Sequence, residues 1–157
     1  MTALTGRTNA KHIGVKLDNV SGAFTDITAY VSNVGTIGLT HETTDVIAFS
    51  DGVRNVTIGQ ASAPISLSGP FDTTLHAQMI AYVNGKQTAG EGLGLDIYIG
   101  VRAAWEDGAP AFGLIGAAAT GYQVTSYTVS SSGMTWSATL EPFGATAPTW
   151  TTSVHST

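Results

Sequence analysis

The fold is decided by one stretch, residues 63–85, which reads APISLSGPFDTTLHAQMIAYVNG. Within it the spacing of the apolar residues changes. Ile65 and Leu67 alternate with serines, which is the two-residue repeat of a strand with one buried face. The Gly69-Pro70 dipeptide that follows is expected to end this strand.

A helix is predicted over about residues 72–83. Asp72 is placed to accept backbone N–H bonds as the N-cap, and Asn84-Gly85 is expected to close the far end. The apolar residues that recur at helical spacing are Leu75, Met79, Ile80 and Val83. One amphipathic helix of about 12 residues, roughly 18 Å long, cannot make a core alone, so we expect it to lie on a sheet built by the rest of the chain.

The remainder of the chain has the patterns of strands. Alternating apolar residues, or clusters of β-branched residues, predict strands near residues 13–17, 24–31, 34–40, 56–58, 93–101, 112–118, 122–130 and 134–140. Gly59-Gln60 shifts the alternation as a β-bulge would, and Trp136 falls on a core position. The chain is therefore expected to be mainly β, either a β-sandwich or a partly closed β-barrel, with one flanking α-helix.

A length of 157 residues suits a single domain. We expect a β domain over residues 12–141, between a polar N-terminal arm, residues 1–11, and a C-terminal arm, residues 142–157. The first residues have neither a basic cluster nor an apolar core, so no secretory signal is expected. No apolar run approaches the roughly 20 residues of a membrane span, so we expect no membrane insertion.

The charge content is low. Charged residues make up 11% of the chain, against about 25% in an ordinary soluble domain. Such a composition favours a domain that hides much of its surface against copies of itself, because interface cores are depleted in charge. The net charge of -5, with only six Lys and Arg, argues against a protein that grips nucleic acid. It is compatible with a neutral or acidic wall past which DNA slides.

No catalytic or metal-binding constellation is found in the sequence. Cysteine is absent, and the four histidines are far apart, at positions 12, 41, 76 and 155. Recognisable zinc sites need clustered ligands. The glycines at 90, 92 and 94 precede a strand, whereas phosphate-binding loops follow one. We therefore predict no enzyme activity, no cofactor and no metal.

Two features indicate contact surfaces. Residues 39–56 form a long polar excursion, and loops of this length are commonly functional. It carries an apolar insert, Val46, Ile47 and Phe49, before a turn signal at Asp51. Trp105, at a predicted hairpin end, and Trp150, in the C-terminal arm, are expected to anchor interfaces with their large amphipathic rings.

Three motifs carry a resemblance to a known family. They are DITAYV at 26–31, DVIAFSDG at 45–52 and ISLSGPFD at 65–72. Together they resemble the tail tube (major tail) proteins of long-tailed bacteriophages, in which D-I-[ST]-x-Y-V, D-V-T-x-F-G-D and S-L-x-G-x-[FW]-D occur in the same order. The resemblance extends over about residues 24–75. Ile47, Ser50 and Pro70 depart from the residues common in that family.

The resemblance implies a virion protein that assembles with itself into hexameric rings, stacked into a hollow tube through which DNA passes. It also implies contacts with other tail proteins, and synthesis and assembly in the cytoplasm of a bacterial host. In that family a long loop reaches the next ring and terminal arms bridge subunits. We therefore assign Val46, Ile47, Phe49 and Asp51 to an inter-ring stacking loop, as a hypothesis.

Two alternatives remain open at this point. One is a minor tail or decoration protein of the same fold, because a fold does not determine a function. The other is a carbohydrate-binding β-sandwich module with Trp105 or Trp150 as the platform for a sugar ring. The state of assembly separates them, since a carbohydrate-binding module stays small and a tube subunit forms rings or polymers.

Overall fold

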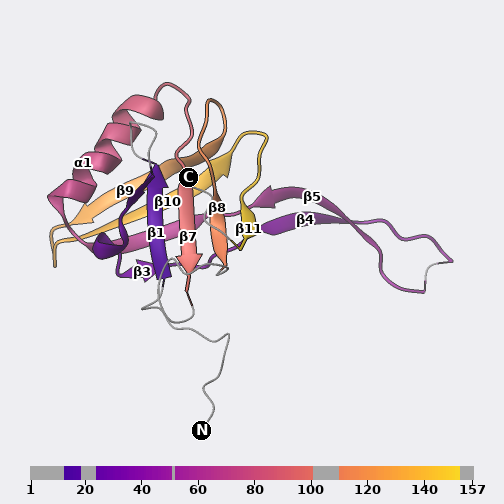
Figure 1. Ribbon diagram of the computed structural model, residues 1–157. Helices are drawn as coiled ribbons and strands as arrows, with labels where there is room; N and C mark the ends of the chain where they lie inside the picture. Colours follow the sequence, from indigo (N-terminus) through magenta and orange to yellow (C-terminus); the bar gives the residue numbers. More distant parts are fainter. Residues whose placement is uncertain (1–12, 19–23, 51, 101–109, 153–157) are drawn as a thin grey trace, which may run out of the picture.

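The computed structural model describes residues 13–18, 24–50, 52–100 and 110–152. Strands dominate this part of the chain, which has two larger antiparallel sheets and one hairpin (Figure 1). The five-stranded sheet has the order β11 (Thr149–Thr151), β8 (Ala111–Leu114), β7 (Leu95–Ile99), β1 (Ile13–Asp18) and β2 (Phe24–Asp26). The four-stranded sheet has the order β3 (Asn33–Val34), β6 (Ile65–Pro70), β10 (Thr135–Phe143) and β9 (Gly121–Ser130).

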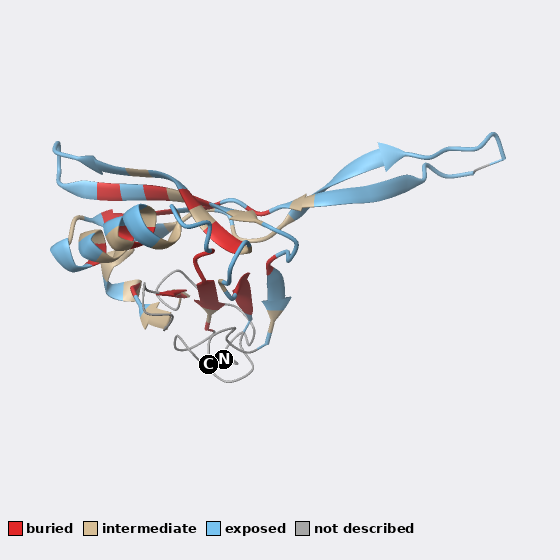
Figure 2. Cartoon of the chain, turned by 90° about the horizontal axis from the view of Figure 1, so that it is seen from above, coloured by how far each residue is buried: buried red, intermediate tan, exposed pale blue. Residues whose placement is uncertain are grey.

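The layers are clear when the molecule is seen from above. The four-stranded sheet forms one layer, and the helix α1 (Thr73–Ala81) and the five-stranded sheet both lie on the same side of it (Figure 2). The hairpin of β4 (Thr40–Asp45) and β5 (Val56–Ser62) projects away from this body (Figure 1). The described strands close no barrel, so the sandwich is the predicted alternative that is seen.

The core lies between these layers. The four-stranded sheet contributes Ile65, Leu67, Tyr122, Trp136, Ala138 and Leu140, all nearly inaccessible to solvent. The five-stranded sheet contributes Val15, Leu17, Leu95, Ile97, Phe112 and Leu114. The core positions of Ile65, Leu67 and Trp136 confirm the sequence prediction. Tyr82 is also buried, although its place in the core was not predicted.

Strand β6 is longer than predicted. The expected stop at Gly69-Pro70 is wrong, because both residues still pair with β10, Gly69 with Trp136 and Pro70 with Thr135. Gly69 is required there by close packing, since a Cβ atom would lie 2.1 Å from the carbonyl oxygen of Tyr30. β3 pairs with β6 only at Leu67 and Ser68, so Pro70 lies beyond that pairing, where β6 has a free edge on that side and a missing N–H is tolerated. The turn to the helix therefore comes only after Pro70.

The predicted start of the helix is confirmed, and its predicted end is wrong. Asp72 caps it, accepting a bond from the Thr74 amide at 2.7 Å. The chain does not close at Asn84-Gly85 but continues as a π-helical turn, Tyr82–Lys86. Tertiary hydrogen bonds stabilise this turn. Tyr82 Oη donates to the carbonyl oxygen of Tyr122 at 2.8 Å, and the side chain of Gln87 bonds both backbone groups of Val124.

In three other stretches the observed structure differs from the strand that the alternation of apolar residues predicted. The strand predicted over 24–31 ends at Asp26, whose carboxylate accepts bonds from the amide and hydroxyl of Thr28 and starts a 3-10 turn, Thr28–Tyr30. In the strand predicted over 34–40, the pairing with β6 ends after Val34 and the Gly35 amide, which donates to Ser66 at 2.8 Å, and Thr40 already belongs to β4. In β7 consecutive residues from Leu95 to Tyr98 are all buried, so both faces of this strand are covered and the expected polar side is absent.

Two substitutions test the packing of α1 and the core. Asp72→Ala is expected to lower the free energy of unfolding by about 1 kcal/mol, because an amide at the helix start loses its acceptor. Trp136→Ala should cost about 3–5 kcal/mol through the cavity it leaves. Urea unfolding measures both. The matched control, Thr73→Ala, changes an exposed residue beside the cap and should stay within about 0.5 kcal/mol of wild type.

The two buried tyrosines predict an alkaline weakening of the fold. Burial raises the pKa of Tyr82 to about 12, and it raises the pKa of Tyr122 as well. An unfolded tyrosine titrates near pH 10, so above this pH the unfolded chain releases protons that the folded chain keeps. Stability is therefore complete below about pH 10 and falls as the pH rises towards 12. In urea unfolding from pH 9 to 12, Tyr82→Phe should show a shallower fall than wild type. Equal falls would contradict this account.

Candidate assembly surfaces

The described residues present little that resembles a catalytic site. They contain no group of three His, Asp or Glu side chains that could hold a metal ion. His76 Nδ1 lies 2.9 Å from the hydroxyl of Tyr127, an ordinary packing contact on the flank of the helix. Burial raises the pKa of the Asp18 carboxyl, the charge of Lys86 opposes this rise, and the charge of Glu91 adds to it. Within the described ranges Asp18 belongs to no group that could hold a metal ion. None of the helical segments in the described ranges has the length and apolar character needed to cross a membrane.

The most prominent surface feature is the hairpin of β4 and β5, which we call the arm. The sequence predicted a long loop here, and the prediction is wrong in that the two sides pair from Thr40–Ser62 to Asp45–Val56. All of β4 and nearly all of β5 is exposed (Figure 2). The predicted bulge is confirmed, because Glu42 alone faces both Gly59 and Gln60.

The tip of the arm is apolar and exposed. Val46 is 52% exposed, Ile47 is 59% exposed and Phe49 is fully exposed. Val53, on the returning side, is 72% exposed and extends the same patch, although the sequence did not single it out. A group of exposed apolar side chains at the end of an extended hairpin is typical of an interaction site. Asp51 lies outside the described residues, so its role stays a prediction.

An ion pair closes the arm just below this tip. Arg54 contacts Asp45 through Nε at 2.8 Å and through a terminal nitrogen at 2.7 Å. Both side chains are more than half exposed, and pairs of this kind contribute at most about 1 kcal/mol in water. The backbone pairing continues past it, since the Val46 amide donates to Asn55. The arm is thus ordered up to the start of the apolar tip.

The outer face of the four-stranded sheet has an unusual composition. Its outward residues pair hydroxyl with hydroxyl across the strands, as in Ser137 with Thr128, whose oxygens lie 3.0 Å apart. We call this surface the hydroxyl face: Ser66, Ser68, Ser126, Thr128, Ser130, Thr135, Ser137 and Thr139. Neither the helix nor the other sheet covers it (Figure 2). Glu141 is the one charged residue in the four strands that form this sheet.

The same sheet has an open edge. β9 is its outermost strand, and residues 125–130 of β9 are largely exposed and uncharged. Native proteins commonly protect such edges with charge, proline or a covering segment, because an open edge pairs with other strands. β9 has none of the charges or prolines that would do so.

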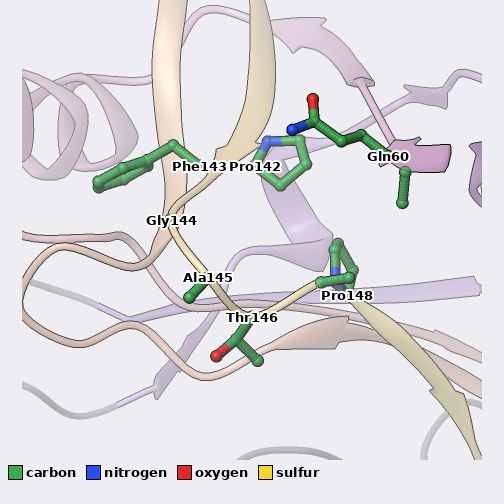
Figure 3. Close-up of a pocket in the computed structure, with 9 residues that line it drawn as sticks. Gln60, Pro142, Phe143, Gly144, Ala145, Thr146 and Pro148 are labelled. Carbon is green, nitrogen blue, oxygen red and sulfur yellow. The ribbon is translucent and has the colours of Figure 1, made fainter.

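A hollow of about 490 Å³ lies where the arm meets the body (Figure 3). Gln60 and Ala61 of β5 line one side, and residues 142–148, the end of β10 and the segment that follows it, line the other. No charged side chain lines it. The hollow is open to solvent, and its lining lacks the convergent polar groups of a catalytic pocket.

Of the two tryptophans predicted to anchor interfaces, the structure describes Trp150 but not Trp105. Trp150 lies in β11, which pairs with β8, so this part of the predicted C-terminal arm is an edge strand of the five-stranded sheet. Its ring packs on Phe112 with centroids 5.1 Å apart and stays 47% exposed. Trp105 lies outside the described residues. Anchoring of an interface by either residue stays a prediction.

Comparison with known proteins gives matches among solved structures alone. No protein-family model matches the chain, and no curated protein matches it. A chain in the C6-symmetric tail of an empty gene transfer agent particle shares 24% identity, with 92% of this chain and 99% of that chain covered and a TM-score of 0.61.

Two further matches come from injection systems. A chain in the tube-terminating cap of the anti-feeding prophage has a TM-score of 0.66 at 15% identity, covering 98% of this chain and 96% of that one. A chain in the extended PVC sheath-tube complex has a TM-score of 0.59 at 17% identity, covering 95% of this chain and 94% of that one. At these identities the likeness establishes the fold. The chain therefore has, over nearly its whole length, the fold of chains found in phage-like tail and tube assemblies.

Proposed function

We propose that this chain is a structural tail protein whose copies form rings, and that the rings stack into a hollow tube through which DNA passes. The observation that carries this proposal is the fold match, which spans nearly the whole of both chains and occurs in C6-symmetric tails and sheath-tube complexes. The exposed arm, the open edge and the uncharged surfaces agree with a subunit that completes itself against copies. On this proposal it is made and assembled in a bacterial host and contacts other tail proteins.

Ring closure would use the open edge of the four-stranded sheet. Residues 125–130 of β9 form the open part of one edge, because Tyr122 and Val124 already bond Leu93 and Gln87, and the short strand β3 lies at the other edge. If β9 of one copy paired with the β3 edge of its neighbour, the backbone groups at both edges would be hydrogen-bonded. A closed ring of copies would then leave no free edge in this sheet. Residues 1–11 and the end of the chain are proposed to bridge subunits, with Trp105 and Trp150 as anchors.

Stacking of rings would use the tip of the arm. Ile47 and Phe49 are exposed, and the arm that carries them projects away from the body of the subunit (Figure 1), so a second copy is the natural place for them to be buried. Full burial of each would contribute about 1.5–3 kcal/mol. A contact between a tip and a different surface of the next copy is head-to-tail, and such contacts continue indefinitely when they do not close.

One observation favours a second role within the same class. A matching chain belongs to a tube-terminating cap, with a TM-score of 0.66. A minor tail protein that ends a tube would form rings that do not stack on themselves. The assembly of the purified chain separates the two roles.

The stacking role predicts a specific loss. Ile47→Glu combined with Phe49→Glu should leave a folded chain that forms rings but no tubes, because two charges would have to be buried between rings. Deletion of residues 42–52 should have the same effect. Negative-stain electron microscopy measures ring and tube formation, and urea unfolding checks the fold. The matched control, Ile80→Glu, changes a partly exposed apolar residue of α1 and should leave tubes intact.

Two results would count against the proposal. Normal tubes from the double variant would remove the tip from the stacking contact. A wild-type chain that stays a single subunit at high concentration, and that binds a carbohydrate, would remove the structural role and favour the carbohydrate-binding module.

A further inference from the structure

We propose that the tip of one copy's arm docks on the end of the next copy's body that lies farthest from that copy's own arm. The receiving surface is an exposed apolar patch formed by Val129 and Met134, which we call the distal patch. This inference rests on the proposed function. It adds the surface that receives the tip, which the stacking role alone leaves open.

The distal patch and the arm lie at opposite ends of the four-stranded sheet. The arm joins this sheet at the Ile65 end of β6, because β5 ends at Ser62. At the other end of β6, Pro70 pairs with Thr135, so the turn from β9 to β10 lies there. The arm and this turn extend in opposite directions from the body (Figure 2).

Stacking through the arm requires a receptor at the end without an arm. Identical rings in a stack all face the same way, so an arm that leaves its own ring on one side meets the opposite side of the next ring. The copy that receives the tip therefore presents the end farthest from its own arm. The hollow lined by Gln60 and residues 142–148 does not meet this requirement, because it lies at the root of the arm (Figure 3).

The distal patch matches the tip in chemistry. Val129 is 41% exposed and Met134 is 51% exposed, and the half-buried Phe71 adjoins them, since its amide donates to the Met134 carbonyl at 2.9 Å. Residues 121–140 contain no charged side chain, and neither do residues 46–50 at the tip. The two surfaces can therefore join without removing an ion from water. Methionine adapts its shape to an apolar partner, which suits it to such a contact.

The backbone at Met134 is a second, independent observation. Its φ is 48°, in the left-handed region that residues with a side chain seldom adopt. Glycine would take this conformation without strain, as Gly133 beside it does at a φ of 111°. The turn instead keeps a large apolar side chain that is exposed in the single subunit. A strained backbone that holds an exposed apolar side chain points to a use for that side chain outside the subunit.

Met134→Gly separates folding from stacking. Glycine relieves the strain, so the variant should unfold at the same urea concentration as wild type or a higher one. It should nevertheless raise the protein concentration needed for tube growth about tenfold or more, because an apolar contact is lost at every joint. Sedimentation of tubes over a dilution series measures this concentration. The matched control, Ile80→Ala, trims an apolar side chain of α1 that is 39% exposed and should leave the concentration unchanged. An unchanged concentration for Met134→Gly overturns the inference.

Cysteine pairs test the contact itself. The chain has no cysteine, so Ala48→Cys and Ser130→Cys place thiols beside the apolar residues of the tip and of the distal patch without removing them. Assembled tubes of the double variant, treated with a short bis-maleimide, should give a ladder of dimers, trimers and longer covalent chains on a denaturing gel. Each single variant has one thiol and can give at most dimers. Ala48→Cys combined with Thr146→Cys, at the hollow, or with Ala77→Cys, on α1, should give no ladder.

The two proposals fail in different ways. A wild-type chain that forms neither rings nor tubes overturns the proposed function. Wild-type rings that never stack overturn this inference and leave the tube-terminating role. Normal tubes of the double variant that show no ladder between positions 48 and 130 overturn the distal patch as the receptor, and the proposed function stands.

Discussion

The structure depends on the burial of one face of the four-stranded sheet, and of one face only. Ile65, Leu67, Trp136 and Leu140 point from it towards α1 and the five-stranded sheet. The large aromatic residues carry polar atoms into this core, and each finds a backbone acceptor. Trp136 Nε1 donates to Tyr30 at 3.0 Å, and the hydroxyl of Tyr122 donates to Ala63 at 3.2 Å. These bonds fix the four-stranded sheet to the segments at Tyr30 and Ala63 at defined positions, so the core has one arrangement as well as an apolar interior.

The parts that were predictable from the sequence are those where one local rule acts alone. The alternation in β6 and β10, the cap at Asp72 and the bulge at Gly59-Gln60 each follow from a few neighbouring residues. The parts that were not predictable depend on distant partners. The π-helical turn after α1 is stabilised by Tyr122 and Val124, about 40 residues further along the chain.

The candidate surfaces likewise combine features that local sequence predicts with features that depend on distant partners. The apolar insert at 46–49 is visible in the sequence because apolar residues interrupt a polar stretch. That it is held out on a paired arm depends on the register of β4 with β5, which no local pattern specifies. The hydroxyl face was missed because serine and threonine in alternate positions look like the ordinary solvent side of a strand. It becomes a surface only when β6, β10 and β9 are placed side by side.

The bulge in the arm has a consequence for how this protein can vary. Glu42 faces two residues, so the alternation of side chains on β5 changes sides between the body and the tip. Adding or removing one residue between the bulge and the tip would turn every following side chain to the opposite face of the hairpin. Among natural variants, each strand of the arm should therefore differ in length by an even number of residues, or the change should move together with the bulge, because an odd change in each strand would reverse the direction in which the tip is presented.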